Sequence, residues 1–207
     1  VVADLYLTHA PQACRNFLKL CKTRAYDGNL FFRVVQGFLA QTGDPTGTGR
    51  GGRCVLHGQG SGGASSDGRA NGCDGTRFFR DEHHPKHPSH DLVGTIGMSH
   101  TLGGKNQNGS QFYITLRSGL GDQLDGKFTA FARIVEDDGG RVLAALNAAH
   151  VDNKERPLED IRVLRTHVLD DPFPDPDGLA PGPYPAPRYL GCPPEAETAA
   201  AIYPRKS

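Results

Sequence analysis

Four histidines lie close together and form the first grouping in the chain that could do chemistry. They are His83, His84, His87 and His90. Two imidazoles four residues apart can share a metal ion when both lie on one face of a helix. Pro85 and Pro88 fall between these histidines and would break such a helix. We therefore expect a solvated loop here and predict no metal site.

Two further motifs have the spacing of nucleotide and RNA sites but lack the context. Gly47-Thr48-Gly49-Arg50-Gly51-Gly52 fits the glycine pattern with which a helix N-terminus approaches a pyrophosphate. No helical periodicity follows it, so we interpret the segment as a turn-rich loop. Residues 126–131 contain the aromatics of an RNA-binding strand, but with the basic residue and the glycine transposed. We therefore expect no cofactor and no RNA contact from these segments.

The composition excludes several classes of function. The chain has 207 residues, of which 23 are basic and 23 acidic, so its formal net charge is zero. This balance excludes a polycation that binds nucleic acid by bulk charge, so any RNA contact must be local or lie outside this chain. No apolar run approaches the roughly 18 residues of a membrane-spanning helix, so we expect a soluble intracellular protein without membrane contact.

The five cysteines give no sign of a disulfide framework or a zinc ribbon. Their number is odd, and no two of them form a CxxC pair. We therefore expect no disulfide framework and a reducing compartment.

Glycine and proline divide the chain into a folded unit, an insertion and a tail. Between Gly43 and Gly75 lie 12 of the 27 glycines, a composition that favours a mobile insertion at about residues 53–76. From Val168 onward lie 10 of the 15 prolines with six acidic and three basic residues, which is typical of an extended linker. We predict a folded domain over residues 1–167 and a Pro-rich tail over residues 168–207.

Inside the domain we predict many short strands and two helices. Thr8 to Pro11 offer a cap and an early-turn proline before apolar residues at helical spacing, which predicts a helix from about Pro11 to Lys22. A second helix should follow Gly139-Gly140, with Val142, Leu143, Leu146 and Ala149 on one face. The strand candidates are residues 1–7, 30–35, 38–41, 93–98, 111–116, 128–135 and 161–166. This pattern favours a β-barrel or sandwich capped by helices.

The most specific segment is residues 31–49, FFRVVQGFLAQTGDPTGTG. It closely resembles the signature of the cyclophilins, the peptidyl-prolyl cis-trans isomerases. Gly97-Met98-Ser99, then residues 108–114 (NGSQFYI) and 124–131 (LDGKFTAF), match the family's next blocks in the same order. Residues 14–22 (CRNFLKLCK) and 167–173 (HVLDDPF) are similar to the peptidyl-prolyl isomerase-like 4 subfamily. Its members are nuclear cyclophilins that carry an RNA-recognition motif after the isomerase domain.

The resemblance implies a mainly β fold, an eight-stranded antiparallel barrel closed by two α-helices. Residues 1–7 would be the second strand, with the family's first strand absent from this chain. It also implies a nuclear monomer that binds proline-containing peptides and RNA-processing proteins, and that contacts RNA only through a domain absent from this chain. Since the chain also begins with Val1 instead of Met, we expect a fragment of a longer protein.

Prolyl isomerisation needs no nucleophile, because the barrier of roughly 18–20 kcal/mol arises from amide resonance. A site lowers that barrier by binding the twisted amide better than the planar forms, so it needs an apolar slot for the ring and a fixed donor. Arg33 suits the donor role, because a guanidinium is always charged and presents several N–H groups. Through the resemblance, the predicted catalytic residues are Arg33, Phe38 and Gln41.

The resemblance also predicts a set of substrate-binding residues. They are Leu39, Ser99, His100, Gln111, Tyr113, Leu124 and Phe128. Gln111 has an equal alternative as a buried glutamine that satisfies the sheet. The segment after His100 is two residues longer than usual, which loosens the alignment there. Gln123 stands where many cyclophilins have tryptophan and Phe128 where most have histidine, so we expect weak cyclosporin binding and an altered rate or substrate preference.

These observations favour a peptidyl-prolyl cis-trans isomerase that assists folding or remodelling of proteins in nuclear RNA-processing complexes. The alternative is a catalytically weak module that binds proline-containing partners in a spliceosome-type assembly. A third alternative is a barrel that only spaces other domains. The first two differ in whether Arg33→Ala removes a rate or only an affinity.

Overall fold

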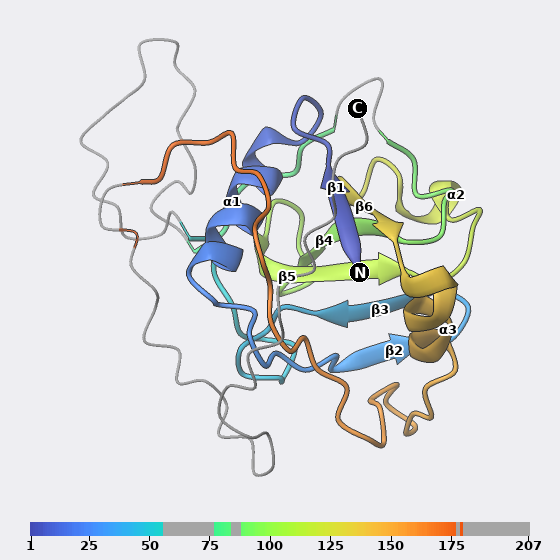
Figure 1. Cartoon of the computed structure of the whole chain (residues 1–207). Helices are drawn as coiled ribbons and strands as arrows, with labels where there is room; N and C mark the ends of the chain where they lie inside the picture. The colour runs from blue at the N-terminus through green and yellow to red at the C-terminus, as the bar shows by residue number, and fades with distance from the viewer. Residues whose placement is uncertain (56–76, 84–87, 177–178, 180–207) are drawn as a thin grey trace, which may run out of the picture.

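The structure is a computed structural model that describes residues 1–55, 77–83, 88–176 and 179. Its centre is one antiparallel sheet with the strand order β1-β6-β4-β5-β3-β2 (Figure 1). The strands are β1 (Val2–Leu5), β2 (Arg33–Val35), β3 (Leu39–Thr42), β4 (Thr95–His100), β5 (Asn108–Thr115) and β6 (Ala130–Glu136). The helices are α1 (Pro11–Lys22), α2 (Gly121–Leu124) and α3 (Arg141–Asn147), with a 3-10 turn η1 (Asp138–Gly140) before α3. The predicted mainly β class is confirmed.

The sheet has two edges in the described part of the chain, since β1 and β2 do not pair with each other. Residues 161–166, predicted as a strand, are not one. They join residues 28–31 by the single bridge Leu30–Arg162 and by a few backbone hydrogen bonds, such as Phe31 N–H to the Ile161 carbonyl. The ladder stays short because the neighbouring segment turns at Gly28, whose φ is 77°.

Helix α1 has the bounds that the sequence predicts, Pro11 to Lys22, although its cap comes from another segment. The Glu82 carboxylate accepts the backbone N–H groups of Gln12 at 3.0 Å and Ala13 at 2.9 Å. A carboxylate at a helix N-terminus satisfies free donors and complements the helix dipole. Ala10 is the N-cap residue of α1, and the helix has no capping hydrogen bond from an N-cap side chain. The capping hydrogen bonds therefore come from Glu82 and not from Thr8 or its neighbours.

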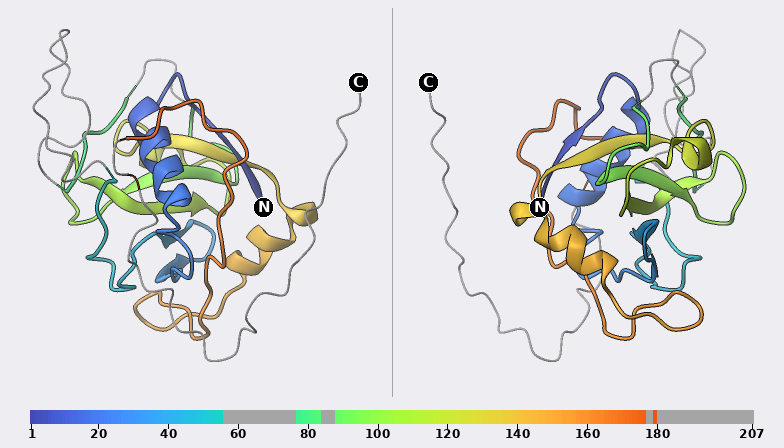
Figure 2. Two further views of the ribbon diagram at one scale, coloured as in Figure 1. Left: turned by 60° about the vertical axis from the view of Figure 1, so that its left-hand side comes forward. Right: turned by 90° about the vertical axis from the view of Figure 1, so that its right-hand side faces the viewer.

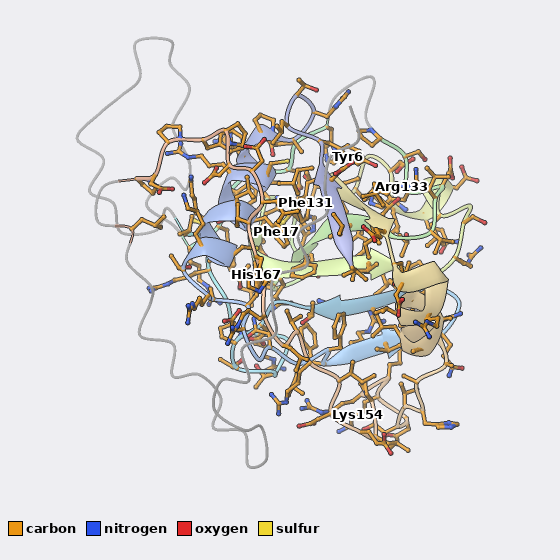
Figure 3. The ribbon with its side chains drawn as sticks, viewed as in Figure 1. Tyr6, Phe17, Phe131, Arg133, Lys154 and His167 are labelled. Carbon is orange, nitrogen blue, oxygen red and sulfur yellow. The ribbon has the colours of Figure 1, made fainter. Side chains whose placement is uncertain are left out.

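The main core lies between α1 and one face of the sheet (Figures 1 and 2). Phe17 of α1 meets Phe112 of β5 edge to face at 5.3 Å and Phe131 of β6 at 5.1 Å, both between ring centroids. Figure 3 shows Phe17 and Phe131 together at this interface. Aromatic pairs at such distances stabilise a core beyond the area they bury, so α1 holds β5 and β6 in place.

Helix α3 begins after Gly140 as predicted, but it is shorter and less buried than expected. Only Leu146 of the helix is buried, Val142 is exposed, and Ala149 lies beyond the helix end. The reason is its position over the hairpin of β2 and β3. There the side chain of Asn147, the last residue of the helix, accepts the Gly37 N–H at 2.7 Å.

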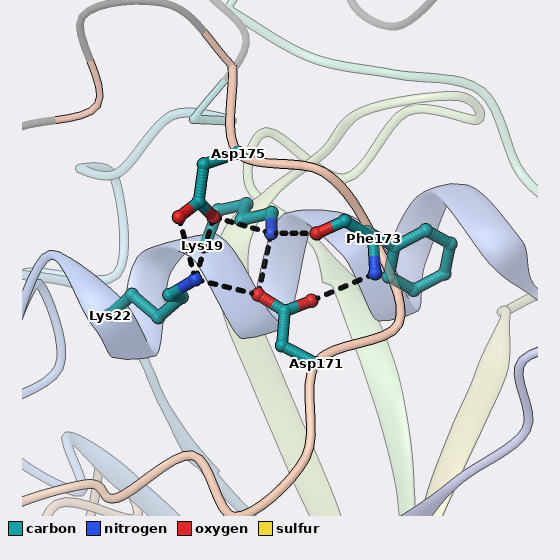
Figure 4. A network of polar contacts seen from close by, with 5 residues as sticks. All are labelled: Lys19, Lys22, Asp171, Phe173 and Asp175. Carbon is teal, nitrogen blue, oxygen red and sulfur yellow. Dashed lines mark hydrogen bonds and ion pairs between the residues drawn. The ribbon is translucent and has the colours of Figure 1, made fainter.

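The segment after residue 167 packs on α1 (Figure 4). The ammonium of Lys19 donates to Asp171 at 2.6 Å, to Asp175 at 2.7 Å and to the carbonyl of Phe173 at 2.7 Å. Lys22 bonds the same two carboxylates. We call these five residues the α1 clasp. Residues 180–207 of the predicted tail, and residues 56–76 of the predicted insertion, lie outside the described residues.

Cys54 is buried and disulfide-bonded, a bond that the expectation of no disulfide framework did not include. Its partner lies outside the described residues. Cys14 and Cys21 are free, and burial raises the pKa of each thiol to about 12, which disfavours the thiolate at neutral pH.

Within the described residues, every helix is too short or too polar to cross a lipid bilayer.

Candidate functional site

Strand register brings three predicted residues to one face of the sheet, opposite α1. Residues directly opposite each other in an antiparallel pair share a face. Arg33 lies opposite Gln41, Gln41 opposite Tyr113, and Tyr113 opposite Gly97 of β4. A Cβ at Gly97 would collide with the Tyr113 ring, so the glycine makes room for that ring.

An apolar cluster, separate from the main core, covers this face. Its buried members are Leu39, Tyr113, Leu120 and Leu124, with Phe38 and Phe128 partly buried against them. We call these six residues the pocket cluster. Leu120 was not predicted; its only signal is an apolar residue between Gly119 and Gly121, at the start of α2. The two partly exposed rings leave an apolar surface that a proline ring could contact.

Amide groups form the polar edge of the site. Gln41 Nε2 donates to Ser99 Oγ at 2.7 Å and to Gln111 Oε1 at 3.0 Å. Gln111 is fully buried, and its Nε2 donates to the carbonyls of Gly49 at 2.9 Å and Gly51 at 3.0 Å. Because backbone carbonyls can only accept, the amide nitrogen of Gln111 must face Gly49 and Gly51, and its oxygen must face Gln41. The Gln41 amide must then direct its nitrogen toward Gln111. Gln41 therefore uses both N–H groups inside the protein and keeps Oε1 as its remaining acceptor.

The glycine-rich loop of residues 44–51 is built around one buried carboxylate. Asp44 accepts the backbone N–H groups of Thr46, Thr48, Gly49 and Gly51 at 2.6–3.1 Å. Burial acts to raise the pKa of Asp44, but these hydrogen bonds outweigh it and hold the pKa below its usual value. The Asp44 carboxylate therefore occupies the backbone N–H groups that would bind a phosphate in a nucleotide site. This supports the interpretation of the segment as a turn-rich loop.

His100 lies at the other end of the pocket cluster, as a support for Phe128. Its ring packs on that of Phe128 at 4.8 Å between centroids, and its Nε2 lies 2.7 Å from Asp81 Oδ1. Asp81 also accepts the Asn106 N–H and the Asn108 amide, each at 2.9 Å. Partial burial acts to raise the pKa of Asp81, but these donors together lower it. Phe128 is thus fixed by an imidazole anchored on a carboxylate.

The expectation of a solvated histidine loop is wrong for His90, whereas His84 and His87 lie outside the described residues. His90 is fully buried behind the pocket cluster, with Nε2 at 2.8 Å from the Tyr113 hydroxyl and Nδ1 at 2.5 Å from Asp125. Burial raises the pKa of Tyr113 well above its usual value. The feature of the sequence that could have indicated a buried histidine is Tyr113, because the hydroxyl of a buried tyrosine needs a hydrogen-bond partner. Among the described residues no group of three possible ligands could hold a metal ion.

Arg33 has a partner that the sequence analysis missed. Its Nε donates to Glu155 Oε2 at 2.7 Å, and the two side chains are 41% and 43% exposed. The guanidinium therefore lies at the rim of the site, near Gln41 and open to solvent.

Comparison with known proteins assigns the chain and its fold to one family. Residues 1–168 match the model of the family described as cyclophilin type peptidyl-prolyl cis-trans isomerase/CLD. The chain belongs to this family. The cyclophilin domain is similar to a solved cyclophilin type peptidyl-prolyl cis-trans isomerase of Cryptosporidium parvum, obtained in the presence of the dipeptide Ala-Pro. That pair is 30% identical with a TM-score of 0.64, over 79% of this chain and 88% of the other.

Curated relatives of this cyclophilin differ in length. Peptidyl-prolyl cis-trans isomerase CYP59 of Arabidopsis thaliana is 46% identical over 87% of this chain and 32% of its own length. Peptidyl-prolyl cis-trans isomerase-like 4 of Homo sapiens is 43% identical over 86% of this chain and 33% of its own length. The chain thus spans about a third of these two relatives. CYP18-2 of Arabidopsis thaliana is 38% identical over 81% of this chain and 86% of its own length.

Proposed function

We propose that this cyclophilin domain catalyses cis-trans isomerisation of X-Pro peptide bonds in protein substrates. The observation that carries the proposal is the juxtaposition on one sheet face of the pocket cluster, the guanidinium of Arg33 and the acceptor of Gln41. No acid, base or nucleophile is needed, because rotation makes and breaks no σ bond. The Ala-Pro dipeptide of the Cryptosporidium parvum structure supports a proline-containing ligand.

Each group has a role that follows from its geometry. The rings of Phe38 and Phe128 and the side chain of Leu124 hold the proline ring in an apolar slot. An N–H of Arg33 donates to the amide as it twists and loses resonance, which stabilises the twisted form more than either planar form. Gln41 Oε1 accepts a backbone N–H of the peptide, because both donors of that amide are already used.

The cellular role of the whole protein is a further part of the proposal. The likeness of residues 14–22 and 167–173 to the isomerase-like 4 subfamily, and the matches to two proteins of that group, support a place in nuclear RNA-processing complexes. A proline-binding module without catalysis is the alternative. It is favoured by Phe128, which places an apolar ring where most of the family has a histidine.

Exchange NMR on a short Ala-Pro peptide tests the activity with the 207-residue chain. We expect the parent protein to broaden or exchange the cis and trans peptide signals. Phe38→Ala should weaken peptide binding by roughly tenfold, because it removes the partly exposed ring of the slot. Val142→Ala is the matched control, since Val142 is exposed on α3 away from the pocket cluster. A folded parent that leaves the exchange rate at that of the free peptide would contradict the proposal.

A further inference from the structure

Glu155 adopts a backbone conformation that costs energy. Its φ is 64°, in the left-handed region that residues with a Cβ rarely occupy. Such strain persists only where the surrounding structure imposes it, and it gathers at functional sites. An observed strained residue beside the proposed catalytic arginine therefore calls for a functional explanation.

The turn of residues 152–156 imposes that conformation from inside. The Asp152 carboxylate accepts the N–H groups of Lys154 at 2.8 Å and Arg156 at 2.9 Å. The backbone closes the same turn, with Asp152 N–H to the Arg156 carbonyl at 2.8 Å and Glu155 N–H to the Asp152 carbonyl at 3.0 Å. Asp152 therefore accepts the N–H group of Glu155 through its carbonyl and that of Arg156 through its carboxylate, which fixes the backbone on both sides of Glu155.

Two further bonds attach this turn to the site. The Glu155 carbonyl accepts the N–H of Val34, the residue after Arg33, at 2.7 Å. Arg156 Nη1 donates to the Gly47 carbonyl at 3.0 Å, in the loop whose later carbonyls orient Gln111. In Figure 3 Lys154 marks the turn, which lies beyond the sheet edge formed by β2. The Glu155 side chain is thus held against Arg33 at a fixed distance.

The contact between the two side chains uses the inner nitrogen of the guanidinium. Arg33 Nε donates to Glu155 Oε2, whereas a bidentate pair would also engage a terminal nitrogen. A bond at Nε fixes the rotation of the guanidinium plane about the side chain. It leaves the terminal N–H groups for another acceptor, at a side chain that is 41% exposed.

We propose that Glu155 is a positioning residue for Arg33, which holds the guanidinium plane so that its terminal N–H groups meet the twisted X-Pro amide. The inference rests on the proposed isomerase function and deepens it. The turn of residues 152–156 imposes the backbone conformation of Glu155, and this conformation places its side chain beside Arg33. Glu155 touches no substrate and acts only through Arg33.

If Glu155 has this role, Glu155→Gly should lower the isomerisation rate without lowering the stability of the domain. Gly tolerates a φ of 64°, so Glu155→Gly should keep or raise the midpoint of thermal unfolding. The same change should lower kcat by roughly 10- to 100-fold with KM nearly unchanged, because the donor is no longer held in place. Glu155→Asp keeps a carboxylate and should recover part of the loss.

The experiment measures peptide exchange and thermal unfolding for six proteins on the full 207-residue chain. They are the parent, Glu155→Gly, Glu155→Asp, the control Glu159→Gln, Arg33→Lys, and the double variant Arg33→Lys with Glu155→Gly. Glu159 is an exposed acid on the same segment. We expect Glu159→Gln to match the parent, and Glu155→Gly to add no further loss in the Arg33→Lys background.

The outcomes separate this inference from the proposed function. An active parent with an equally active Glu155→Gly variant overturns the positioning role and leaves the isomerase proposal intact. A further loss in the Arg33→Lys background would also overturn it, because Glu155 would then act by another route. A loss of rate that tracks a lower unfolding midpoint would assign Glu155 a merely structural role. A folded parent without activity overturns both.

Discussion

The α1 clasp and the Arg33–Glu155 pair use the same kinds of charge in opposite ways. The ammonium of Lys19 has no exposed surface, and its three donors meet three oxygens, from Asp171, Asp175 and the Phe173 carbonyl. Arg33 is 41% exposed and spends one of its five N–H groups on Glu155. Saturation and burial suit the first pair to stability, while open donors suit the second to binding a substrate.

The largest expected effect is on the clasp. Lys19→Ala removes the fully buried partner of Asp171 and leaves that carboxylate with Lys22 and the Phe173 N–H, and breaking a buried pair costs about 3 kcal/mol. Urea unfolding of the variant measures the loss, with Lys22→Ala as the matched control. Lys22 bonds the same carboxylates but is 34% exposed, so its removal should cost far less. Equal losses for the two lysines would mean that burial does not distinguish them.

The loss of the buried contact between Tyr113 and His90 should have an effect between those of the two pairs. Tyr113→Phe removes the hydroxyl that lies 2.8 Å from His90 Nε2 and leaves that buried nitrogen without this partner. The loss of one hydrogen-bond partner of a buried polar group costs about 1–3 kcal/mol. Urea unfolding again measures the change. An unchanged stability would show that the His90 network contributes nothing to the rear of the pocket.

Acid should weaken the clasp. Partial burial acts to raise the pKa of Asp171, but hydrogen bonds from Lys19, Lys22 and the Phe173 N–H outweigh it and lower the pKa. The stabilisation is therefore complete above the unfolded value of about 3.9 and is lost as pH falls through the lower folded pKa. The difference in unfolding free energy between the parent and Asp171→Asn should shrink below about pH 4. A constant difference from pH 6 to pH 2.5 would contradict this.

The smallest change in stability is expected for a substitution of Arg33 in the candidate functional site. Exposed ion pairs contribute at most about 1 kcal/mol, so Arg33→Ala should shift the unfolding free energy by less than that. The comparison of the two regions fails if Arg33→Ala destabilises the domain as much as Lys19→Ala does.

Local signals made some elements predictable. Helix α1 has its predicted bounds because Pro11 and the apolar spacing lie within the helix itself. Residues 161–166 were wrong as a strand because pairing depends on the neighbouring segment, which turns away at Gly28. The two segments that resemble the isomerase-like 4 subfamily contain four of the five clasp residues, yet nothing in the sequence shows that they touch.

Within the site, the resemblance predicted the residues, and the structure supplied their partners. Strand alternation and register explain why Arg33, Gln41 and Tyr113 share a face. Glu155 could not be found in this way, because 122 residues separate it from Arg33 and its position depends on a strained turn. His90 was misassigned since its burial comes from Tyr113 and Asp125, which are distant in sequence.

The central claim is that Arg33 lowers the barrier to rotation and does not only hold the peptide. Exchange NMR on an Ala-Pro peptide gives the isomerisation rate and the peptide Kd in one sample, for the parent and for Arg33→Ala. We predict that the variant stays folded, loses the rate by about 100-fold and keeps its Kd within about threefold. A variant whose affinity falls while its rate per bound peptide is unchanged would contradict the claim and identify a proline-binding module.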